Sequence, residues 1–444
     1  MELEGSDSVG DGPPFQVEPQ AMAVLERLWH AGHSAYLVGG GVRDALMGLP
    51  VGDWDVATDA RPERILHLFP GSSYQNRFGT VLAQGVEITT FRRDHRYADH
   101  RRPDSVTFSE DIFEDLARRD LTINAIAWGR LGPEAAAQLV DPADGRRDLE
   151  ARLVRAVGDP GRRFDEDALR LLRAVRIAAR LDFAIEPFTL RAMVDHARDI
   201  EWVSEERIAS ELRQMLGAAT PSRALHLLRQ TGILATTLPE LEALPPAALE
   251  AALAALDAVA LAHPHHERLA LAALLGATVG EDTRSLLTRL RVGAHDVDAV
   301  VALVDNAHTV YHPAWSDADV RRYMSRVPDD LLDDLLALRT ARAIDGTAGQ
   351  LERQLQERIA RERASAPPLT LGDLAVDGRD LQETLGIPEG PAIGIILERL
   401  LADVIDEPAL NRRGTLLTRA SLTLDELQAG RGGAKDGAAH PPIR

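Results

Sequence analysis

Tyr36-Leu37-Val38-Gly39-Gly40-Gly41-Val42-Arg43-Asp44 is the stretch that decides the fold of this chain. Its apolar start predicts a strand that runs into the glycines, and the spacing after them predicts a helix. Glycines allow the backbone to approach a ligand, and the first turn of a helix offers unpaired N–H groups to a phosphate. Gly40 and Arg43 are therefore candidate phosphate contacts, although a tight turn without a ligand fits the glycine run as well.

Two carboxylates follow this turn, Asp53 and Asp55, on either side of Trp54. Because residues i and i+2 of a strand point to the same face, a strand here would project both carboxylates together. Adjacent carboxylates repel each other unless a cation lies between them, and Mg²⁺ is commonly held by one or two carboxylates with substrate phosphates. We expect Asp53 and Asp55 to be catalytic metal ligands for Mg²⁺, with Glu87 as a candidate third ligand. Solvated aspartates in a turn are the alternative.

The surrounding sequence shows two patterns. Between Ala35 and Phe91, short apolar runs alternate with helical spacing, which predicts an α+β head with a mixed sheet. From about Leu149 onward the strand signals vanish, and helical spacing broken by proline and glycine predicts an all-helical remainder. The predicted strands are Ala35–Val38, Trp54–Ala57, Thr80–Ala83 and Val86–Phe91, and the predicted head helices are Val42–Met47 and Pro62–Leu68.

Composition restricts the classes of function. At 444 residues the chain is longer than one compact core usually holds, which predicts several domains. The absence of cysteine excludes disulfide partners, thiolate metal sites and cysteine nucleophiles, and it suits a reducing cytoplasm. We find no pattern of a membrane span or signal peptide. The net charge of −19 argues against nucleic acid, but Arg92–Arg102 is a local basic cluster, unless it is simply a solvated loop.

A further pair of charged residues lies in the part predicted to be helical. Asp167 and Arg170 are three residues apart, so on a helix they share a face. Arginine donors fit N3 and O2 of cytosine or N1 of adenine, and an aspartate oxygen fits the amino group of either base. Uracil and guanine present a carbonyl there, so the pair can select C and A without a template. An ordinary helix ion pair is the alternative; Arg173 and Arg176 continue the three-residue step.

Other segments join these two in order along the chain. They are Arg118–Ala125, Asp141–Leu149, Arg163–Arg176, Ser204–Leu212, Asp373–Val376 and Leu385–Pro391. Together with Leu37–Asp55 they resemble the ordered motifs of the class II tRNA nucleotidyltransferase and poly(A) polymerase family, whose head has a polymerase-β-like fold. The resemblance spans roughly residues 21–417.

This resemblance implies an enzyme, a nucleotidyltransferase that adds C and A from CTP and ATP to the 3′ acceptor end of tRNA. The reaction needs no template, releases pyrophosphate, uses Mg²⁺ and belongs to the cytoplasm, with no membrane partner. The resemblance assigns catalysis and metal binding to Asp53 and Asp55. It assigns nucleotide binding to Gly40, Arg43, Arg119, Asp167, Arg170, Arg173 and Arg176.

Six segments are expected from these patterns. Residues 1–18 and 429–444 should be disordered tails, residues 19–148 the nucleotidyltransferase head, residues 149–215 a base-reading helical neck, residues 216–366 a helical body, and residues 367–428 an RNA-binding helical tail. In the body, His263, His265 and His266 precede an apolar run, as in a metal-dependent HD phosphohydrolase domain. The His-Asp pair that should follow is missing, so we expect a degenerate HD-like region with the histidines in a loop.

The product is less well defined than the reaction class. Gln75–Val81 resembles the tRNA branch of the family more than its poly(A) polymerases, and the complete loop from Asp94 to Val106 disfavours members that add only C. An A-adding-only tRNA nucleotidyltransferase or a poly(A) polymerase stays open as the alternative. A degenerate RNA-binding scaffold is the non-enzyme alternative, although a scaffold has no use for a pair of metal-binding carboxylates.

Overall fold

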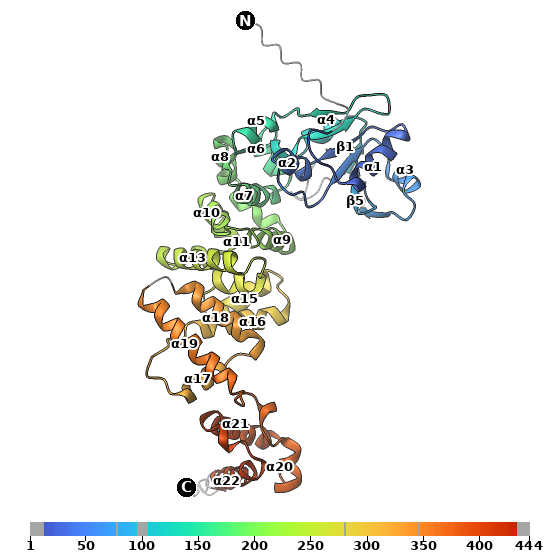
Figure 1. Ribbon diagram of the computed structural model, residues 1–444. Helices are drawn as coiled ribbons and strands as arrows, with labels where there is room; N and C mark the ends of the chain where they lie inside the picture. Colours follow the sequence, from blue (N-terminus) through green and yellow to red (C-terminus); the bar gives the residue numbers. More distant parts are fainter. Residues whose placement is uncertain (1–12, 77–78, 96–104, 279–280, 344–345, 433–444) are drawn as a thin grey trace, which may run out of the picture. The chain divides into compact units, whose positions relative to one another are not determined.

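The computed structural model describes residues 13–76, 79–95, 105–278, 281–343 and 346–432. The chain divides into two compact units (Figure 1). The first contains residues 1–253, 260–267 and 285–292, and the second contains residues 254–259, 268–284 and 293–444. Every helix within the described ranges is too short or too polar to cross a membrane.

The first unit contains a seven-stranded mixed sheet with the strand order β3-β4-β5-β2-β1-β8-β9. β2 and β5 pair in parallel, and all other neighbours in this sheet pair antiparallel. A separate hairpin is formed by β6 and β7. The strands are β1 (Ala35–Val38), β2 (Asp55–Thr58), β3 (Ser73–Asn76), β4 (Thr80–Ala83), β5 (Val86–Thr90), β6 (Arg92–His95), β7 (Ser105–Phe108), β8 (Ala127–Arg130) and β9 (Gln138–Val140).

Helices cover both faces of this sheet (Figure 1). α1 and α3 pack on one face, in an apolar core that includes Leu37 of β1 and Val56 of β2. α4 packs on the other face, where Tyr36 and Val38 of β1 join a second core. Successive β1 residues thus enter different cores, as the period of a strand requires. The head helices are α1 (Pro19–His30), α2 (Gly40–Leu46), α3 (Pro62–Leu68), α4 (Ile112–Ala117), η1 (Thr122–Asn124) and α5 (Gly145–Glu150).

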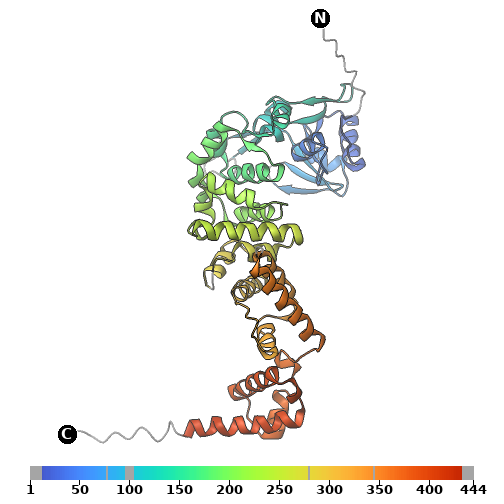
Figure 2. The same ribbon diagram turned by 60° about the vertical axis from the view of Figure 1, so that its left-hand side comes forward.

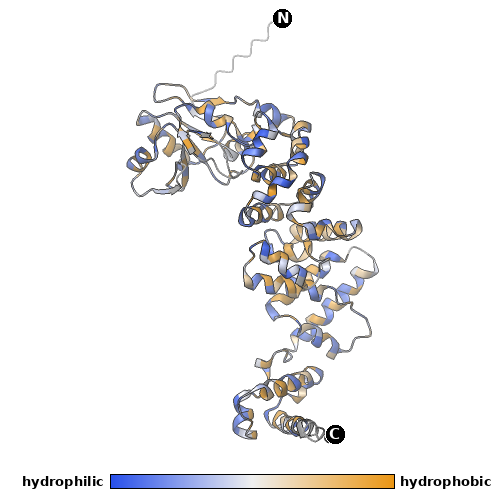
Figure 3. Cartoon of the chain, turned by 180° about the vertical axis from the view of Figure 1, so that it is seen from behind, coloured by the Kyte–Doolittle hydropathy of each residue, from blue (hydrophilic) through white to orange (hydrophobic). Residues whose placement is uncertain are grey.

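The described residues of the remaining chain are helical apart from loops and one short strand pair (Figure 2). Hydrophobic and hydrophilic segments alternate along its ribbons, as expected of helices with one buried face (Figure 3). The helices that complete the first unit or link it to the second are α6 (Pro160–Glu166), α7 (Leu169–Leu181), α8 (Pro187–Asp195), η2 (Ala197–Trp202), α9 (Glu205–Leu216), α10 (Ser222–Gln230), α11 (Ile233–Thr237), α12 (Pro239–Glu242), α13 (Pro246–Ala262), α14 (Glu267–Leu274) and α15 (Glu281–Arg289).

The second unit continues as helices to the end of the described chain. Its last three helices share an apolar core that includes Leu381, Leu400 and Leu416. The helices are α16 (Ala294–Ala307), α17 (Asp317–Met324), α18 (Asp329–Arg342), α19 (Thr347–Ala364), η3 (Leu371–Asp373), α20 (Gly378–Leu385), α21 (Pro391–Asp406), η4 (Pro408–Leu410) and α22 (Arg413–Gly432).

The α+β head and the helical remainder confirm the predicted fold class. β1, β4 and α3 have the predicted bounds. β2 lies one residue later than predicted, β5 ends one residue earlier, and α2 begins two residues earlier and ends one residue earlier, so that Gly40 and Gly41 belong to the helix. The prediction of no strand after Leu149 is wrong in one detail. β10 (Leu153–Val154) and β11 (Ala184–Ile185) form a parallel pair. Two-residue strands are too short to produce the alternating pattern by which strands are recognised in a sequence.

Two other expectations concern loops and chain ends. The cluster His263, His265 and His266 lies in the loop between α13 and α14, as predicted. Residues 13–18, which we assigned to the N-terminal tail, contact the head core through Phe15 and Val17. Residues 429–432, which we assigned to the C-terminal tail, belong to α22, so the expectation of disorder is wrong for them. Residues 1–12 and 433–444 of the expected tails lie outside the described residues.

Candidate active site

The glycine turn between β1 and α2 holds two parts of the head close together. Gly39 has a φ of +78°, and a Cβ there would lie 3.1 Å from Nη1 of Arg119. At Gly41 a Cβ would lie 2.8 Å from the backbone oxygen of Asp53 and 3.1 Å from the Trp54 ring. The helix and the loop before β2 can approach this closely only because residue 41 has no side chain. The glycines therefore position the carboxylate loop as well as exposing backbone N–H groups.

The paired carboxylates do not both belong to a strand. Asp55 is the first residue of β2, and Asp53 lies in the loop before it, so the argument from a shared strand face is wrong for Asp53. Between them Trp54 is buried and stacks on Phe15 with ring centroids 5.9 Å apart. Asp55 is in register with Glu87 on the neighbouring strand β5. Parallel pairing thus places a third acidic residue next to the first two.

The Asp55 carboxyl is strongly desolvated. Burial raises the pKa of its carboxyl from the ordinary value of 3.8 to about 6; the charge of Arg119 opposes this rise, while those of Glu87 and Asp53 add to it. A partly desolvated carboxylate next to two others is stabilised in its charged form by a bound cation. The three residues therefore fit a divalent metal with oxygen ligands, although their oxygens do not all lie within 4.8 Å of one another.

One group of three metal-ligand side chains in the described residues does lie that close together, Asp165, His196 and Asp199. Nδ1 of His196 lies 2.7 Å from Asp199 and 3.4 Å from Asp165. Both carboxylates contact the same ring nitrogen, which is the geometry of a hydrogen-bonded histidine. None of these residues lines the cavity that holds Asp55.

That cavity has a volume of about 470 Å³, within the range of small-molecule sites. It joins the glycine turn and Asp55 to residues at the start of α7. Of the residues predicted to bind metal or nucleotide, Asp53, Arg43, Arg176 and the candidate third ligand Glu87 do not line it. The lining residues are Gly39, Gly40, Asp55, Thr80, Thr89, Arg92, Arg118, Arg119, Asp120, Asn124, Asp167, Leu169, Arg170, Arg173 and Arg207.

Arg43 points its guanidinium into the protein. Its side chain is 2 % exposed, with Nε 2.8 Å from Oδ1 of Asp44 and Nη1 2.6 Å from Oδ1 of Asn124. Burial lowers the pKa of Arg43, and the adjacent Asp44 opposes that change. Arg43 therefore connects α2 to η1, and direct contact between Arg43 and a phosphate stays a prediction.

Asp167 has a partner that the sequence argument missed. It lies in an extended conformation between α6 and α7, and its carboxylate accepts a hydrogen bond of 3.1 Å from the N–H of Leu169. The expectation that it shares a helix face with Arg170 is therefore wrong, since α7 begins only at Leu169. Nη1 and Nη2 of Arg207 donate to its two oxygens at 3.2 and 2.7 Å. Arg170 instead pairs with Glu166, its Nη1 2.6 Å from Oε2.

The other arginines of α7 have different partners. Nε of Arg173 lies 2.6 Å from Oδ2 of Asp120, and Nε of Arg176 lies 2.6 Å from Oε2 of Glu211 on α9. Burial alone would raise the pKa of Asp120, but the charge and hydrogen bond of Arg173 bring that pKa far below its usual value. Arg173 is thus held at the cavity wall, whereas Arg176 is paired with the neck.

The basic cluster from Arg92 to Arg102 is only partly described. Arg92 and Arg93 belong to β6 and not to a loop, because this strand pairs with β7. Arg92 lines the cavity, and Arg93 forms an ion pair with Glu114. Residues 96–104, with the remaining arginines of the cluster, lie outside the described residues, as do residues 77–78 of the segment that resembles the tRNA branch.

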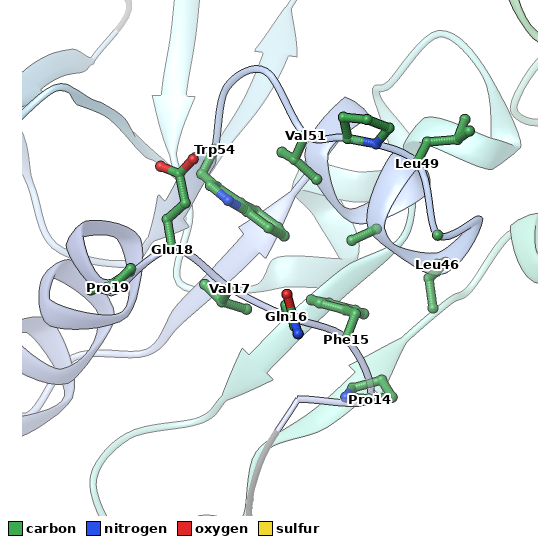
Figure 4. Close-up of a pocket in the computed structure, with 13 residues that line it drawn as sticks. Pro14, Phe15, Gln16, Val17, Glu18, Pro19, Leu46, Leu49, Val51 and Trp54 are labelled. Atoms are coloured by element: carbon green, nitrogen blue, oxygen red, sulfur yellow. The ribbon is translucent and has the colours of Figure 1, made fainter.

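A larger cavity of about 720 Å³ is lined in part by Trp54. Figure 4 shows it between the N-terminal segment Pro14–Pro19 and the segment from Leu46 to Trp54. It contains none of the predicted catalytic or nucleotide-binding side chains. Phe15 and Trp54, which stack on each other, both line it, so the N-terminal segment packs against the loop that carries the carboxylates.

Comparison with known proteins gives consistent matches along the chain. Residues 35–155 match the Poly A polymerase head domain, residues 182–244 match a probable RNA and SrmB-binding site of polymerase A, and residues 262–420 match tRNA nucleotidyltransferase domain 2. The CCA-adding enzyme of Geobacillus stearothermophilus is 35 % identical over 407 residues, which cover 90 % of this chain and 95 % of that protein. The CCA-adding enzyme of Levilactobacillus brevis is 34 % identical over 411 residues, which cover 89 % and 96 %.

A solved structure supports the same grouping. The crystal structure of the Bacillus stearothermophilus CCA-adding enzyme in complex with CTP matches with a TM-score of 0.72 and 30 % identity. The match covers 94 % of this chain and 100 % of that one. With the head-domain match, it confirms the predicted polymerase-β-like head followed by helices.

Proposed function

This chain belongs to the family of CCA-adding enzymes, and from that premise we propose that it adds C and A nucleotides to the 3′ end of tRNA. The substrates are CTP and ATP, pyrophosphate is released, and no template is used. One observation carries the proposal: a single cavity joins the glycine turn and Asp55 of the head to Asp167 and Arg170 beside the neck helix. One nucleoside triphosphate can therefore meet phosphate-binding and base-reading groups at once.

The phosphate end of the site lies in the head. Gly40 contributes backbone N–H groups at the start of α2, and Arg119 lies across Gly39 beside Asp55. We propose that these groups hold the triphosphate while the RNA 3′ hydroxyl attacks the α-phosphorus and pyrophosphate leaves. Arg173, held by Asp120 at the cavity wall, adds a further positive charge.

The base end of the site lies at the start of α7. The carboxylate of Asp167 is the proposed acceptor for the amino group of cytosine or adenine. Arg170 donates to Glu166 and to the carbonyls of Arg163 and Arg118 at 2.6, 3.0 and 3.1 Å. Within the described chain these bonds engage three of its five N–H donors, so two remain to address a base.

The proposed metal ligands are Asp53 and Asp55, with Glu87 beside them, and we propose Mg²⁺ as the ion. The raised pKa of Asp55 supports a cation at this place. When bound, the metal supplies charge to neutralise phosphates and to lower the pKa of the attacking hydroxyl. The side chains themselves provide anionic oxygens near the first residue of β2.

We further propose that residues 19–148 hold the triphosphate, residues 149–215 read the base, and residues 216–366 and 367–428 carry the tRNA. The reaction would take place in the cytoplasm, where tRNA is used. Mg²⁺, these boundaries and this location are parts of the proposal.

The direct test supplies tRNA lacking its 3′ end with CTP, ATP or both, and sequences the products. We expect C-C addition from CTP alone and C-C-A from the mixture. Addition of A alone would identify an A-adding enzyme, and long A tracts a poly(A) polymerase. RNA binding without any addition would favour the scaffold. The Asp53→Ala and Asp55→Ala variants should bind tRNA and add nothing, because both lose a metal ligand.

A further inference from the structure

Hydrogen bonds in the first unit join six side chains into a path that begins and ends on α7, so the helix itself closes the path into a ring. The ring leaves α7, passes through the segment around η1 and then α2, and returns to α7. Nε of Arg173 meets Asp120 at 2.6 Å, Asn124 donates to Asp120 at 3.2 Å, and Arg43 bonds Asn124 at 2.6 Å. In order, its members are Arg173, Asp120, Asn124, Arg43, Asp44 and Arg180. Arg180 donates to the Asp44 oxygen that Arg43 does not contact.

The two ends of the ring lie on one face of α7. Arg173 and Arg180 are seven residues apart, which is close to two turns and about 10 Å along the helix. α7 is therefore hydrogen-bonded to the head at two separated points. The far point is Asp44 of α2, the helix whose first residues form the glycine turn.

The buried members of the ring depend on one another. Asp44 is 5 % exposed, Asp120 8 % and Arg43 2 %. Charges buried to this degree are costly unless each has a partner. Asp44 divides its two oxygens between Arg43 and Arg180, so loss of Arg180 leaves one oxygen without its ionic partner.

We propose that Arg180 is a positioning residue that fixes the glycine helix α2 relative to the base-reading start of α7. The inference rests on the proposed function, because it concerns the span of one nucleoside triphosphate. Arg43, Asp44 and Arg180 do not line the cavity, so they act on the nucleotide only through the elements that they hold. The ring keeps the phosphate site and the base site at the separation that one nucleotide needs.

This role makes different predictions for two ligands. In the proposed function CTP contacts both ends of the site, whereas pyrophosphate contacts only the phosphate-binding groups of the head. When the ring is opened, a ligand that spans both ends must itself restore their alignment, and a ligand at one end need not. Arg180→Ala should weaken binding of CTP about tenfold and change binding of pyrophosphate less than about twofold.

The experiment measures the dissociation constants of CTP and of pyrophosphate, with Mg²⁺, by titration calorimetry on the full chain. Arg223→Ala is the matched control. The Arg223 side chain is 36 % exposed against 43 % for Arg180, and it likewise pairs with one carboxylate, that of Asp182, outside the ring. The control should bind both ligands as the wild type does.

Arg180→Lys guards against a variant that fails to fold. It keeps the charge but has a shorter reach, so it should weaken CTP binding by an intermediate factor and leave pyrophosphate binding unchanged. Equal weakening of CTP and pyrophosphate binding in either variant would show that the contact merely stabilises the head. CTP binding as strong as that of Arg223→Ala would show that the ring has no role in CTP binding. Either outcome overturns the proposal. Failure of the wild type to extend tRNA would instead overturn the proposed function, and the two-ligand comparison would still report on the ring.

Discussion

Asp167 accepts hydrogen bonds on both carboxylate oxygens from the guanidinium of Arg207, at 3.2 and 2.7 Å. A carboxylate has about four acceptor positions; these two bonds and the one from the N–H of Leu169 take three of them, so a base can still approach the remaining one. The two parallel bonds fix the plane of the acceptor before a nucleotide arrives. Rejection of a base by a mispaired carbonyl needs such a fixed acceptor, because a mobile carboxylate could turn away from the wrong base.

The first prediction concerns this orientation. Arg207→Ala should lower the ratio of kcat/KM for CTP over UTP by about tenfold, because Asp167 loses the bidentate contact that orients it. Arg207→Lys should recover only part of the ratio, since lysine cannot form the paired bonds. Arg213→Ala removes an arginine from the same helix, one that pairs with Glu267, and should leave the ratio unchanged. An equal loss for CTP and UTP in Arg207→Ala would count against an orienting role.

The second prediction concerns the close contact at Gly41. Gly41→Ala should displace the loop that carries Asp53, because the new Cβ would lie 2.8 Å from its backbone oxygen. Overpacking of this kind costs about 1–3 kcal/mol, and we expect nucleotide addition to fall at least tenfold. Gly52→Ala is the control, since a Cβ there meets nothing within 4 Å and that glycine has no positive φ. Similar activity of Gly41→Ala and Gly52→Ala would show that nucleotide addition does not depend on this contact.

The third prediction concerns pH. The Asp55 carboxyl has a pKa raised from 3.8 to about 6 by burial, so its neutral form is favoured in the folded state. Its contribution to stability is therefore present below about pH 4 and is lost as pH rises through 6. Without divalent metal, Asp55→Asn should be more stable than the wild type at pH 7.5 by up to about 3 kcal/mol, with the difference vanishing near pH 4.

Denaturant unfolding at several pH values in EDTA measures this difference. Added Mg²⁺ should stabilise the wild type at pH 7.5 more than the Asp55→Asn protein, because the charged carboxylate then has a partner. A difference between the two proteins that stays constant from pH 4 to 7.5 would show that the desolvated carboxyl is not the cause.

The sequence predicted those features that are encoded locally. The bounds of α3 follow from Pro62 at its start, and those of β1 from an apolar run that ends at the glycines. The carboxylates were found for the same reason, since both lie in one short segment. The place of Glu87 beside Asp55 was also partly predictable from the sequence, because Glu87 is a charged residue in the strand that pairs with β2.

Features that depend on tertiary contacts could not be predicted. Arg207 and Asp167 are 40 residues apart and meet only when α9 packs near the start of α7. Arg43 looks like an exposed phosphate contact until η1 places Asn124 beside its guanidinium. The one sequence signal for Arg207 was its place in a family motif, and such a motif does not identify the residue with which Arg207 pairs. Sequence spacing also assumed that the helix includes Asp167, whereas α7 begins two residues later.

We propose that Asp167 and Arg170 choose the base in place of a template, and a comparison of two substrates tests this role. The measurement is the ratio of kcat/KM for CTP over UTP on tRNA lacking its 3′ end, in the wild type and in Asp167→Ala. Loss of the acceptor leaves the amino group of the correct base unpaired, which costs about 1–3 kcal/mol. We therefore expect the ratio to fall by roughly one to two decades while slow addition persists. An unchanged ratio with a uniform loss of rate would contradict the proposal and would assign base selection to other residues.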